Sequence, residues 1–180
     1  KRQYMDPDNI DDVRTEFKNI TFSNFQKSKA RQELINCIYN CKIENAEVLD
    51  LFSGTGVLGI EAISRGAEHA TLVEKNPQVF KLIQNNIEIT NIADQVTLIN
   101  ANALNLGICE VKPYDLVFLD APYEKSLGKN ALEKVFLNGW LARNALVVWE
   151  DSRSAEVPKD LIYLDEKKYG NTVLTFLNVP

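Results

Sequence analysis

The sequence predicts an α/β domain whose seven-stranded sheet is mostly parallel and ends in an antiparallel hairpin. Short apolar segments alternate along the chain with segments whose apolar residues recur at helical spacing. One apolar segment, Leu116-Val117-Phe118-Leu119, has the unbroken run typical of a strand buried on both faces of a parallel sheet. Near the C-terminus, two strand-like segments are separated by Tyr169-Gly170-Asn171, which predicts a hairpin.

Each expected element in the first half of the chain has its own local signal. Leu34, Ile35 and Ile38 recur at helical spacing and predict a first helix. Gly66 favours the end of a helix, and Pro77 suits the first position of one. The elements expected in order are a helix over about 27–39, a strand over 47–50, a helix over 57–65, a strand over 69–73, a helix over about 77–89 and a strand over 96–99.

The second half continues the alternation and then departs from it. The apolar strand over 116–119 is followed by a helical segment and by a further apolar run that ends at Trp149. Strands that alternate with helices in this way form parallel pairs with right-handed crossovers. The elements expected here are a strand over 116–119, a helix over about 131–136, a strand over 145–149 and hairpin strands over 161–168 and 172–177.

Length and composition limit the classes of protein to consider. The chain has 180 residues, of which 45% are hydrophobic and 25% charged, so we expect one globular domain over 27–180 with an N-terminal extension over 1–26. The three cysteines do not form a disulfide framework, and no apolar run approaches the roughly 18 residues that span a membrane. We therefore expect a cytoplasmic monomer with reduced thiols and no membrane partner.

A glycine-rich turn between the first expected strand and its helix predicts a ligand site. Residues 54–59 fit the pattern G-x-G-x-x-G in the strand-turn-helix context that nucleotide-like ligands require, although a turn without a ligand fits it too. Asp50, at the end of the preceding strand, would repel a pyrophosphate but would help to hold the cationic S-adenosylmethionine. The contacts expected on this side of the cofactor are Asp50, Ser53, Gly54, Thr55 and Gly56.

Two further strand ends supply candidate cofactor contacts. Glu74, at the end of the strand over 69–73, can accept hydrogen bonds from both ribose hydroxyls; the alternative is a surface acid paired with Lys75. Asn102 and Ala103 follow the next strand, where an amide would meet the adenine edge and a small residue would leave room for the ring. Because ligands of open α/β sheets bind at the carboxyl ends of strands, we expect these residues to meet.

The most specific motif is Asp120-Ala121-Pro122-Tyr123, directly after the apolar strand. Methylation of an exocyclic amino group is difficult because the nitrogen lone pair is delocalised into the ring. The Asp120 carboxylate and the Ala121 carbonyl, each accepting one N–H, can direct that lone pair at a methyl carbon, while Pro122 stiffens the turn. Tyr123 offers a ring on which a flipped base can stack, and Asp120 is also expected beside the cofactor. The alternative is an ordinary proline turn.

Four segments together resemble the bacterial RsmD-type methyltransferases: Leu49-Asp50-Leu51-Phe52-Ser53-Gly54-Thr55-Gly56, Glu74-Lys75-Asn76, Asp120-Ala121-Pro122-Tyr123 and Lys168-Tyr169-Gly170-Asn171-Thr172. The resemblance runs from about residue 29 to 177. It implies the class I methyltransferase (Rossmann-like) fold and methyl transfer from S-adenosylmethionine, with S-adenosylhomocysteine as product, to the N2 amino group of a guanine in small-subunit (16S) ribosomal RNA. The family usually has proline where Ala121 stands, and its Arg-Pro-Thr segment is not matched by residues 24–29.

The net charge and the histidine and cysteine residues limit which partners and metals we expect this protein to bind. The net charge of −5 leaves little general affinity for a polyanion, so we expect the RNA to be recognised within a small-subunit assembly intermediate, with help from local basic residues such as Lys29 and Lys129. The single histidine, His69, and the pair Cys37 and Cys41 do not form a metal site, so no metal is expected. Open alternatives are a methyltransferase for adenine, protein glutamine or a small molecule, a non-catalytic assembly factor that binds S-adenosylmethionine, and an NAD-binding oxidoreductase.

Overall fold

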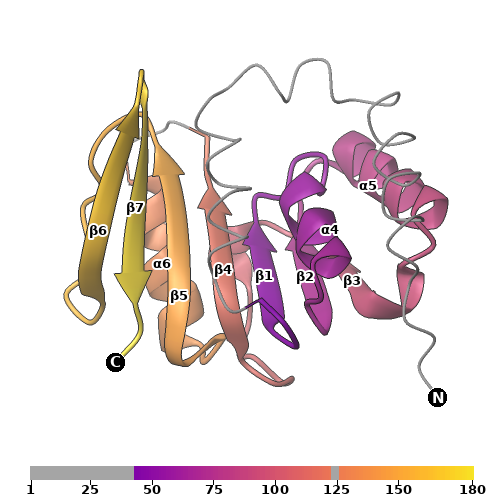
Figure 1. The fold of residues 1–180 in the computed structure, drawn as a ribbon, viewed down its shortest axis with the longest axis horizontal. Helices are drawn as coiled ribbons and strands as arrows, with labels where there is room; N and C mark the ends of the chain where they lie inside the picture. Colours follow the sequence, from indigo (N-terminus) through magenta and orange to yellow (C-terminus); the bar gives the residue numbers. More distant parts are fainter. Residues whose placement is uncertain (1–42, 123–125) are drawn as a thin grey trace.

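The sheet has seven strands in the order β3-β2-β1-β4-β5-β7-β6 in the computed structural model, which describes residues 43–122 and 126–180 (Figure 1). The first five strands in that order pair in parallel, whereas β7 is antiparallel to both β5 and β6. This confirms the predicted mostly parallel sheet with a C-terminal hairpin. The strands are β1 (Glu47–Leu51), β2 (His69–Val73), β3 (Val96–Ile99), β4 (Tyr114–Asp120), β5 (Leu141–Asp151), β6 (Ile162–Tyr169) and β7 (Thr172–Asn178).

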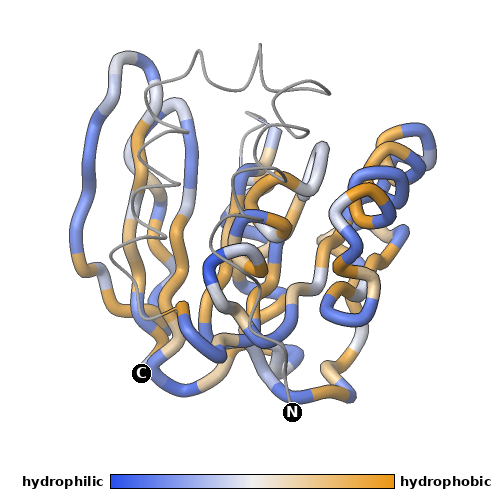
Figure 2. Tube along the Cα trace, turned by 45° about the vertical axis from the view of Figure 1, so that its right-hand side comes forward, coloured by the Kyte–Doolittle hydropathy of each residue, from blue (hydrophilic) through white to orange (hydrophobic). Residues whose placement is uncertain are grey.

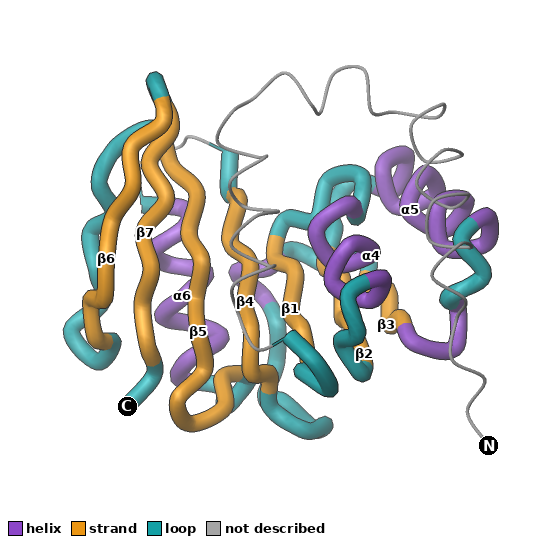
Figure 3. Tube along the Cα trace, viewed as in Figure 1, coloured by secondary structure: helices purple, strands orange, loops and turns teal. Residues whose placement is uncertain are grey.

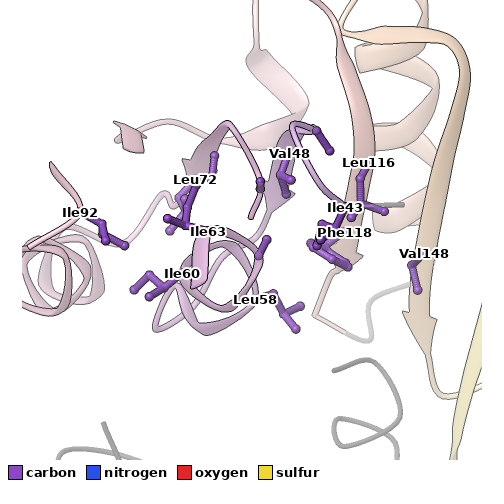
Figure 4. Close-up of a cluster of buried hydrophobic side chains, with 14 of the residues drawn as sticks. Ile43, Val48, Leu58, Ile60, Ile63, Leu72, Ile92, Leu116, Phe118 and Val148 are labelled. Carbon is purple, nitrogen blue, oxygen red and sulfur yellow. The ribbon is translucent and has the colours of Figure 1, made fainter. Parts of the chain in front are cut away.

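Helices cover both faces of the sheet and enclose two apolar layers. Helices α4 (Val57–Ser64) and α5 (Pro77–Ile89) pack on one face, where Leu58, Ile60 and Ile63 meet Leu72 and Phe118 (Figure 4). Helix α6 (Leu127–Leu137) packs on the other face against a second apolar cluster. The short 3-10 helices η1 (Ala93–Gln95) and η2 (Ala103–Asn105) flank β3. The sheet is therefore the middle layer of a three-layer structure.

The alternation of side chains along β1 decides which way its polar residue points. Val48 belongs to the cluster beneath α4 and α5, whereas Leu49 and Leu51 belong to the cluster beneath α6. Since neighbouring residues of a strand face opposite sides, Asp50 points to the side of α4. The glycine-rich turn over residues 54–59 and helix α4 lie on that side, so Asp50 contacts the turn.

Most predicted boundaries agree with the structure, and the differences lie around β5. The helix before β5 begins at Leu127 rather than near Ala131, because Gly128 and Asn130 obscure its helical pattern. Strand β5 begins at Leu141 rather than Ala145, because the polar Arg143-Asn144 pair, with Asn144 at φ 63°, interrupts its apolar run. Strand β4 also extends beyond its apolar core at both ends. The helix expected over 27–39 lies outside the described residues.

Strand β6 forms the polar edge of the sheet. It is hydrophilic over most of its length, whereas the central strands are mainly apolar (Figure 2). The pairing of β6 with β7 shifts register between Tyr163 and Asp165, which leaves Leu164 as an extra residue. Lys167 and Lys168 follow this bulge. Among the helices of the described ranges, none is both long and apolar enough to cross a membrane.

Gly59 sets the distance between α4 and β2, and a side chain there would be costly. A Cβ atom at Gly59 would lie 2.7 Å from Cδ1 of Leu72, a side chain with no exposed surface. We expect Gly59→Ala to lower the free energy of unfolding by about 1 to 3 kcal/mol, because overpacking outweighs the gain in helix propensity. Denaturant unfolding measures the change.

Gly107→Ala is the matched control, because no heavy atom lies within 4 Å of the added Cβ. We expect the control to stay within about 0.5 kcal/mol of the original protein or to gain slightly. If both variants unfolded alike, the close packing of α4 on β2 would not limit stability.

Candidate active site

A cavity of about 360 Å³ opens at the edge of the sheet where the parallel strands end. Its volume falls in the range of small-molecule sites. The end of each of β1, β2, β3 and β4 contributes to its wall, so it occupies the position at which open α/β sheets bind ligands (Figure 1). The lining residues are Phe52, Gly54, Val73, Glu74, Lys75, Ala101, Ala103, Asp120, Ala121 and Pro122.

The glycine-rich turn folds back on the ends of β1 and β2. The Ser53 hydroxyl donates to the carbonyl of Asp50 at 2.7 Å, and its position is fixed further by the carbonyl of Val73 at 3.3 Å. Phe52 and Gly54 both have left-handed backbones, with φ values of 61° and 55°. A Cβ at Gly54 would meet no heavy atom within 4 Å, so the turn presents bare backbone to the cavity. This is the close approach of backbone that a nucleotide-like ligand needs.

The other residues of the turn support it from behind. Gly56 has φ 77°, and a Cβ there would lie 2.8 Å from side-chain atoms of Ile83 and Leu72, so only glycine fits. The carbonyl of Thr55 accepts a hydrogen bond from the amide of Asn86, on α5, at 3.0 Å. Neither Thr55 nor Gly56 lines the cavity. Asn86 is a positioning residue that the sequence motif did not indicate.

Asp50 is a buried acid beneath the turn. Its side chain is 1% exposed, and its Oδ2 accepts the Gly59 N–H at 3.2 Å. Burial raises the pKa of Asp50 from 3.8 to about 8; the Gly59 hydrogen bond opposes the rise, and the charges of Asp120 and Glu74 add to it. Glu74 and Asp120 thus give this edge a negative potential, which suits a cationic ligand and not a pyrophosphate, and Asp50 adds to that potential only when it ionises.

Glu74 is part of the cavity wall. Its Oε2 accepts the Gly54 N–H at 3.1 Å and its Oε1 accepts the Asn76 N–H at 2.7 Å. The Asn100 amide also donates to the Glu74 carbonyl at 2.8 Å. These contacts place the carboxylate across the glycine turn, and its contact with a ribose stays a prediction. The remaining lone pairs of the carboxylate are available to the hydroxyls of a ribose.

Asp120 ends β4 at the opposite wall of the cavity. It pairs in register with Glu150 of β5, whose side chain is buried. Ala121 and Pro122 continue the wall. Tyr123 lies outside the described residues. The proposed amine-directing groups therefore share one cavity with Gly54 and Glu74.

The structure brings some of the predicted site residues together and places others elsewhere. Gly54, Glu74, Ala103, Asp120, Ala121 and Pro122 line the cavity, whereas Asp50, Ser53, Thr55, Gly56 and Asn102 do not. Asn102 caps η2, because its Oδ1 accepts the Leu104 N–H at 3.1 Å; its contact with adenine stays a prediction. Four lining residues were not predicted: Phe52, Val73, Lys75 and Ala101. Within residues 43–122 and 126–180, no cluster of three or more acids, histidines and cysteines could hold a metal.

The buried Asp50 carboxyl predicts a pH-dependent cost of folding. The folded protein binds the Asp50 proton more tightly than the unfolded chain, since the pKa rises from 3.8 to about 8. The cost is absent below the lower pKa and grows as the pH rises towards the upper one, by up to about 1.4 kcal/mol per pH unit. Denaturant unfolding between these pH values should show Asp50→Asn gaining stability relative to the original protein as the pH rises. A constant difference would mean that Asp50 does not titrate in this range.

Glu74→Ala should weaken binding of S-adenosylmethionine and S-adenosylhomocysteine by about 1.5 to 3 kcal/mol, because it removes a charged acceptor of the ribose hydroxyls. Isothermal titration calorimetry measures the loss. Glu74→Gln keeps one acceptor oxygen and should lose less.

Glu88→Ala, the same change on the exposed side of α5, is the control and should bind both ligands unchanged. Equal affinity of the Glu74→Ala and Glu88→Ala variants would leave Glu74 with only its contacts to the turn.

The chain is similar to known proteins over most of its length. Residues 19–178 match the family model described as Conserved hypothetical protein 95. The ribosomal RNA small subunit methyltransferase D of Buchnera aphidicola, subspecies Acyrthosiphon pisum, is 34% identical over 179 residues, which are 98% of this chain and 92% of that protein.

Two solved structures share the fold. A candidate methyltransferase from Escherichia coli has a TM-score of 0.74 at 30% identity, with 85% of this chain and 86% of that chain covered. A candidate methylase from Haemophilus influenzae has a TM-score of 0.73 at 29% identity, with 83% and 96% covered. The fold, the cavity at the strand ends and the match over residues 19–178 agree, and the chain belongs to the Conserved hypothetical protein 95 family, that of the RsmD-type methyltransferases.

Proposed function

We propose that this protein transfers a methyl group from S-adenosylmethionine to the N2 amino group of a guanine in small-subunit ribosomal RNA. The observation that carries the proposal is that Asp120, Ala121 and Pro122 line the same cavity as Gly54 and Glu74. The cofactor side and the acceptor side of a methyl transfer are thus within one cavity. The name of the Buchnera relative supports ribosomal RNA as the substrate.

The cofactor side depends on acids and bare backbone. Glu74 holds the ribose hydroxyls, and Gly54 lets the chain approach the ligand without a side chain. Ala101 and Ala103 leave room for the adenine ring. The negative potential of Glu74 and Asp120 favours a ligand that carries an ammonium and a sulfonium and no phosphate, and such a cation also favours ionisation of the buried Asp50. Bound there, S-adenosylmethionine supplies an electrophilic methyl group on its sulfonium.

The acceptor side acts on the geometry of the amine. Asp120 and the carbonyl of Ala121 each accept one N–H of the guanine amino group and turn its lone pair towards the methyl carbon. As the new N–C bond forms and the S–C bond breaks, the nitrogen becomes positively charged, and the Asp120 carboxylate stabilises that charge. The nitrogen then passes one proton to the Asp120 carboxylate, which releases it to solvent, and a neutral methylated amine and S-adenosylhomocysteine remain. Tyr123 stacks on the flipped base and keeps it in place.

The proposed substrate is RNA in a small-subunit assembly intermediate. The net charge of −5 gives the protein little affinity for a bare polyanion. Ribosomal proteins already bound to the RNA would fix the shape around one guanine and add contacts that the enzyme lacks. A methyltransferase for a different amino group is the main alternative, and a non-catalytic factor that binds S-adenosylmethionine is the second.

Asp120→Ala should lower the rate of methyl transfer by about 100-fold or more while changing cofactor affinity little, because its proposed contacts form with the acceptor amine. The assay uses methyl-labelled S-adenosylmethionine with partly assembled small subunits, protein-free ribosomal RNA and DNA, followed by mapping of the modified nucleotide.

Asp115→Ala is the control, since Asp115 lies on β4 at the far edge of the sheet, where its Oδ2 accepts the Glu47 N–H. It should keep the original rate. Equal rates on protein-free RNA and assembled subunits would reject the assembly intermediate. Methylation of DNA alone, or of no substrate, would reject the ribosomal RNA assignment.

A further inference from the structure

A second cavity, of about 270 Å³, lies between the start of α6 and the end of β5. Its lining residues are Ser126, Gly128, Lys129, Trp149, Asp151, Arg153, Ser154 and Glu156. The segment that leaves the active site at Pro122 reaches this cavity at Ser126, four positions later in the chain. The loop that joins β5 to β6 carries the arginine and runs beside β6 (Figure 3). The two cavities are therefore close to each other along the chain.

The second cavity contains hydrogen-bond donors without acceptors. Ser126 is the N-cap of α6, yet its side chain makes no capping hydrogen bond to the first N–H groups of that helix. Trp149 is 3% exposed, and its Nε1–H is buried with no hydrogen-bond partner among the described residues. A buried donor without an acceptor is costly, and an anion beside it would relieve that cost. A helix N-terminus also favours negative charge.

Two cations, Lys129 and Arg153, and two acids, Asp151 and Glu156, line the cavity. Arg153 is exposed and forms no ion pair with any residue of the described ranges. Lys129 pairs with Glu156 at 3.2 Å, but the Glu156 side chain is 76% exposed, so the pair is weak and easily exchanged. The carboxylate of Asp151 is engaged locally, since its Oδ1 accepts the Ser152 N–H at 2.6 Å. Arg153 and an exchanging Lys129 can therefore face an incoming anion together.

We propose that this second cavity binds a backbone phosphate of the RNA, adjacent to the nucleotide whose base enters the active site. The proposal rests on the proposed function, because it takes RNA as the substrate. A phosphate fits better than a second base, since the nearly buried Trp149 ring leaves no face on which a base could stack. A phosphate fixed in the second cavity would set the register of the RNA strand while the target guanine enters the active site.

Arg153→Gln tests the proposal through RNA affinity rather than activity. The variant should bind a transcript of small-subunit ribosomal RNA about tenfold more weakly, and the slope of log affinity against log salt should fall by about 0.7 to 0.9. Arg143→Gln is the matched control, because Arg143 is also exposed but lies near the start of β5, whereas Arg153 follows the end of that strand. Cofactor affinity should be unchanged in both variants. Equal RNA affinity and salt slope in the two variants would overturn the proposal.

The two tryptophans of the chain provide an independent readout. In nitrogen-15 spectra, a short single-stranded RNA oligomer with a central guanine should shift the indole signal of Trp149. The signal of Trp140 should stay in place, because its Nε1–H donates to Gly107 at the far edge of the sheet. An equal Trp149 shift with inorganic phosphate at the same concentration would assign the cavity to free phosphate and overturn the RNA assignment.

The result for the second cavity can be separated from the result for the proposed function. Methyl transfer by the original protein to partly assembled small subunits reports the proposed function by itself. If that activity is present and Arg153→Gln matches Arg143→Gln in RNA binding, only the phosphate site is rejected. If that activity is absent and the Trp149 signal still shifts with the RNA oligomer alone, the cavity is a phosphate site of an RNA-binding protein with a different role.

Discussion

Two carboxylates hold the glycine-rich turn, and the cavity depends on them. Asp50 accepts the N–H of Gly59 from beneath, and Glu74 accepts the N–H of Gly54 from the side of β2. Without these acceptors, the left-handed residues of the turn would have few partners to fix their strained backbone. Because the same acids set the charge of the cavity, the interactions that shape the turn also select its ligand. A phosphate-bearing cofactor would meet the Glu74 carboxylate at close range, and its charge would oppose ionisation of the buried Asp50.

The buried Asp50 also links cofactor binding to protons. With a pKa of about 8, raised mainly by burial, this carboxyl is largely protonated at neutral pH in the protein without ligand. A cation nearby favours the ionised form and so lowers the pKa. Binding of a cationic methyl donor is then accompanied by proton release, and its affinity rises with pH. The sulfonium becomes a neutral thioether during the reaction, so the product is attracted less strongly to these acids than the methyl donor is. The site can therefore bind the methyl donor in preference to its product.

The sequence predicted the fold well wherever apolar runs coincide with strands. β2, β3 and α5 have the predicted boundaries, because His69, Val96 and Pro77 mark clear changes of pattern. The candidate site was predicted through acids at strand ends, since parallel strands bring their carboxyl ends to one edge. Phe52 could not be predicted as a lining residue, because nothing in the sequence indicates a left-handed phenylalanine. The second cavity could not be predicted either, because tertiary packing alone brings Ser126 and Arg153 to the same cavity and no sequence motif links them.

The extra residue in β6 has a consequence for how the protein behaves among other chains. An edge strand exposes unpaired N–H and C=O groups, which can add a strand from a neighbouring molecule. The register shift at Leu164 bends that edge, and Lys167 and Lys168 follow it with charge. A regular strand from another chain would lose both alignment and charge compatibility along this border. The bulge and the two lysines therefore disfavour the pairing of this edge with a strand of another molecule.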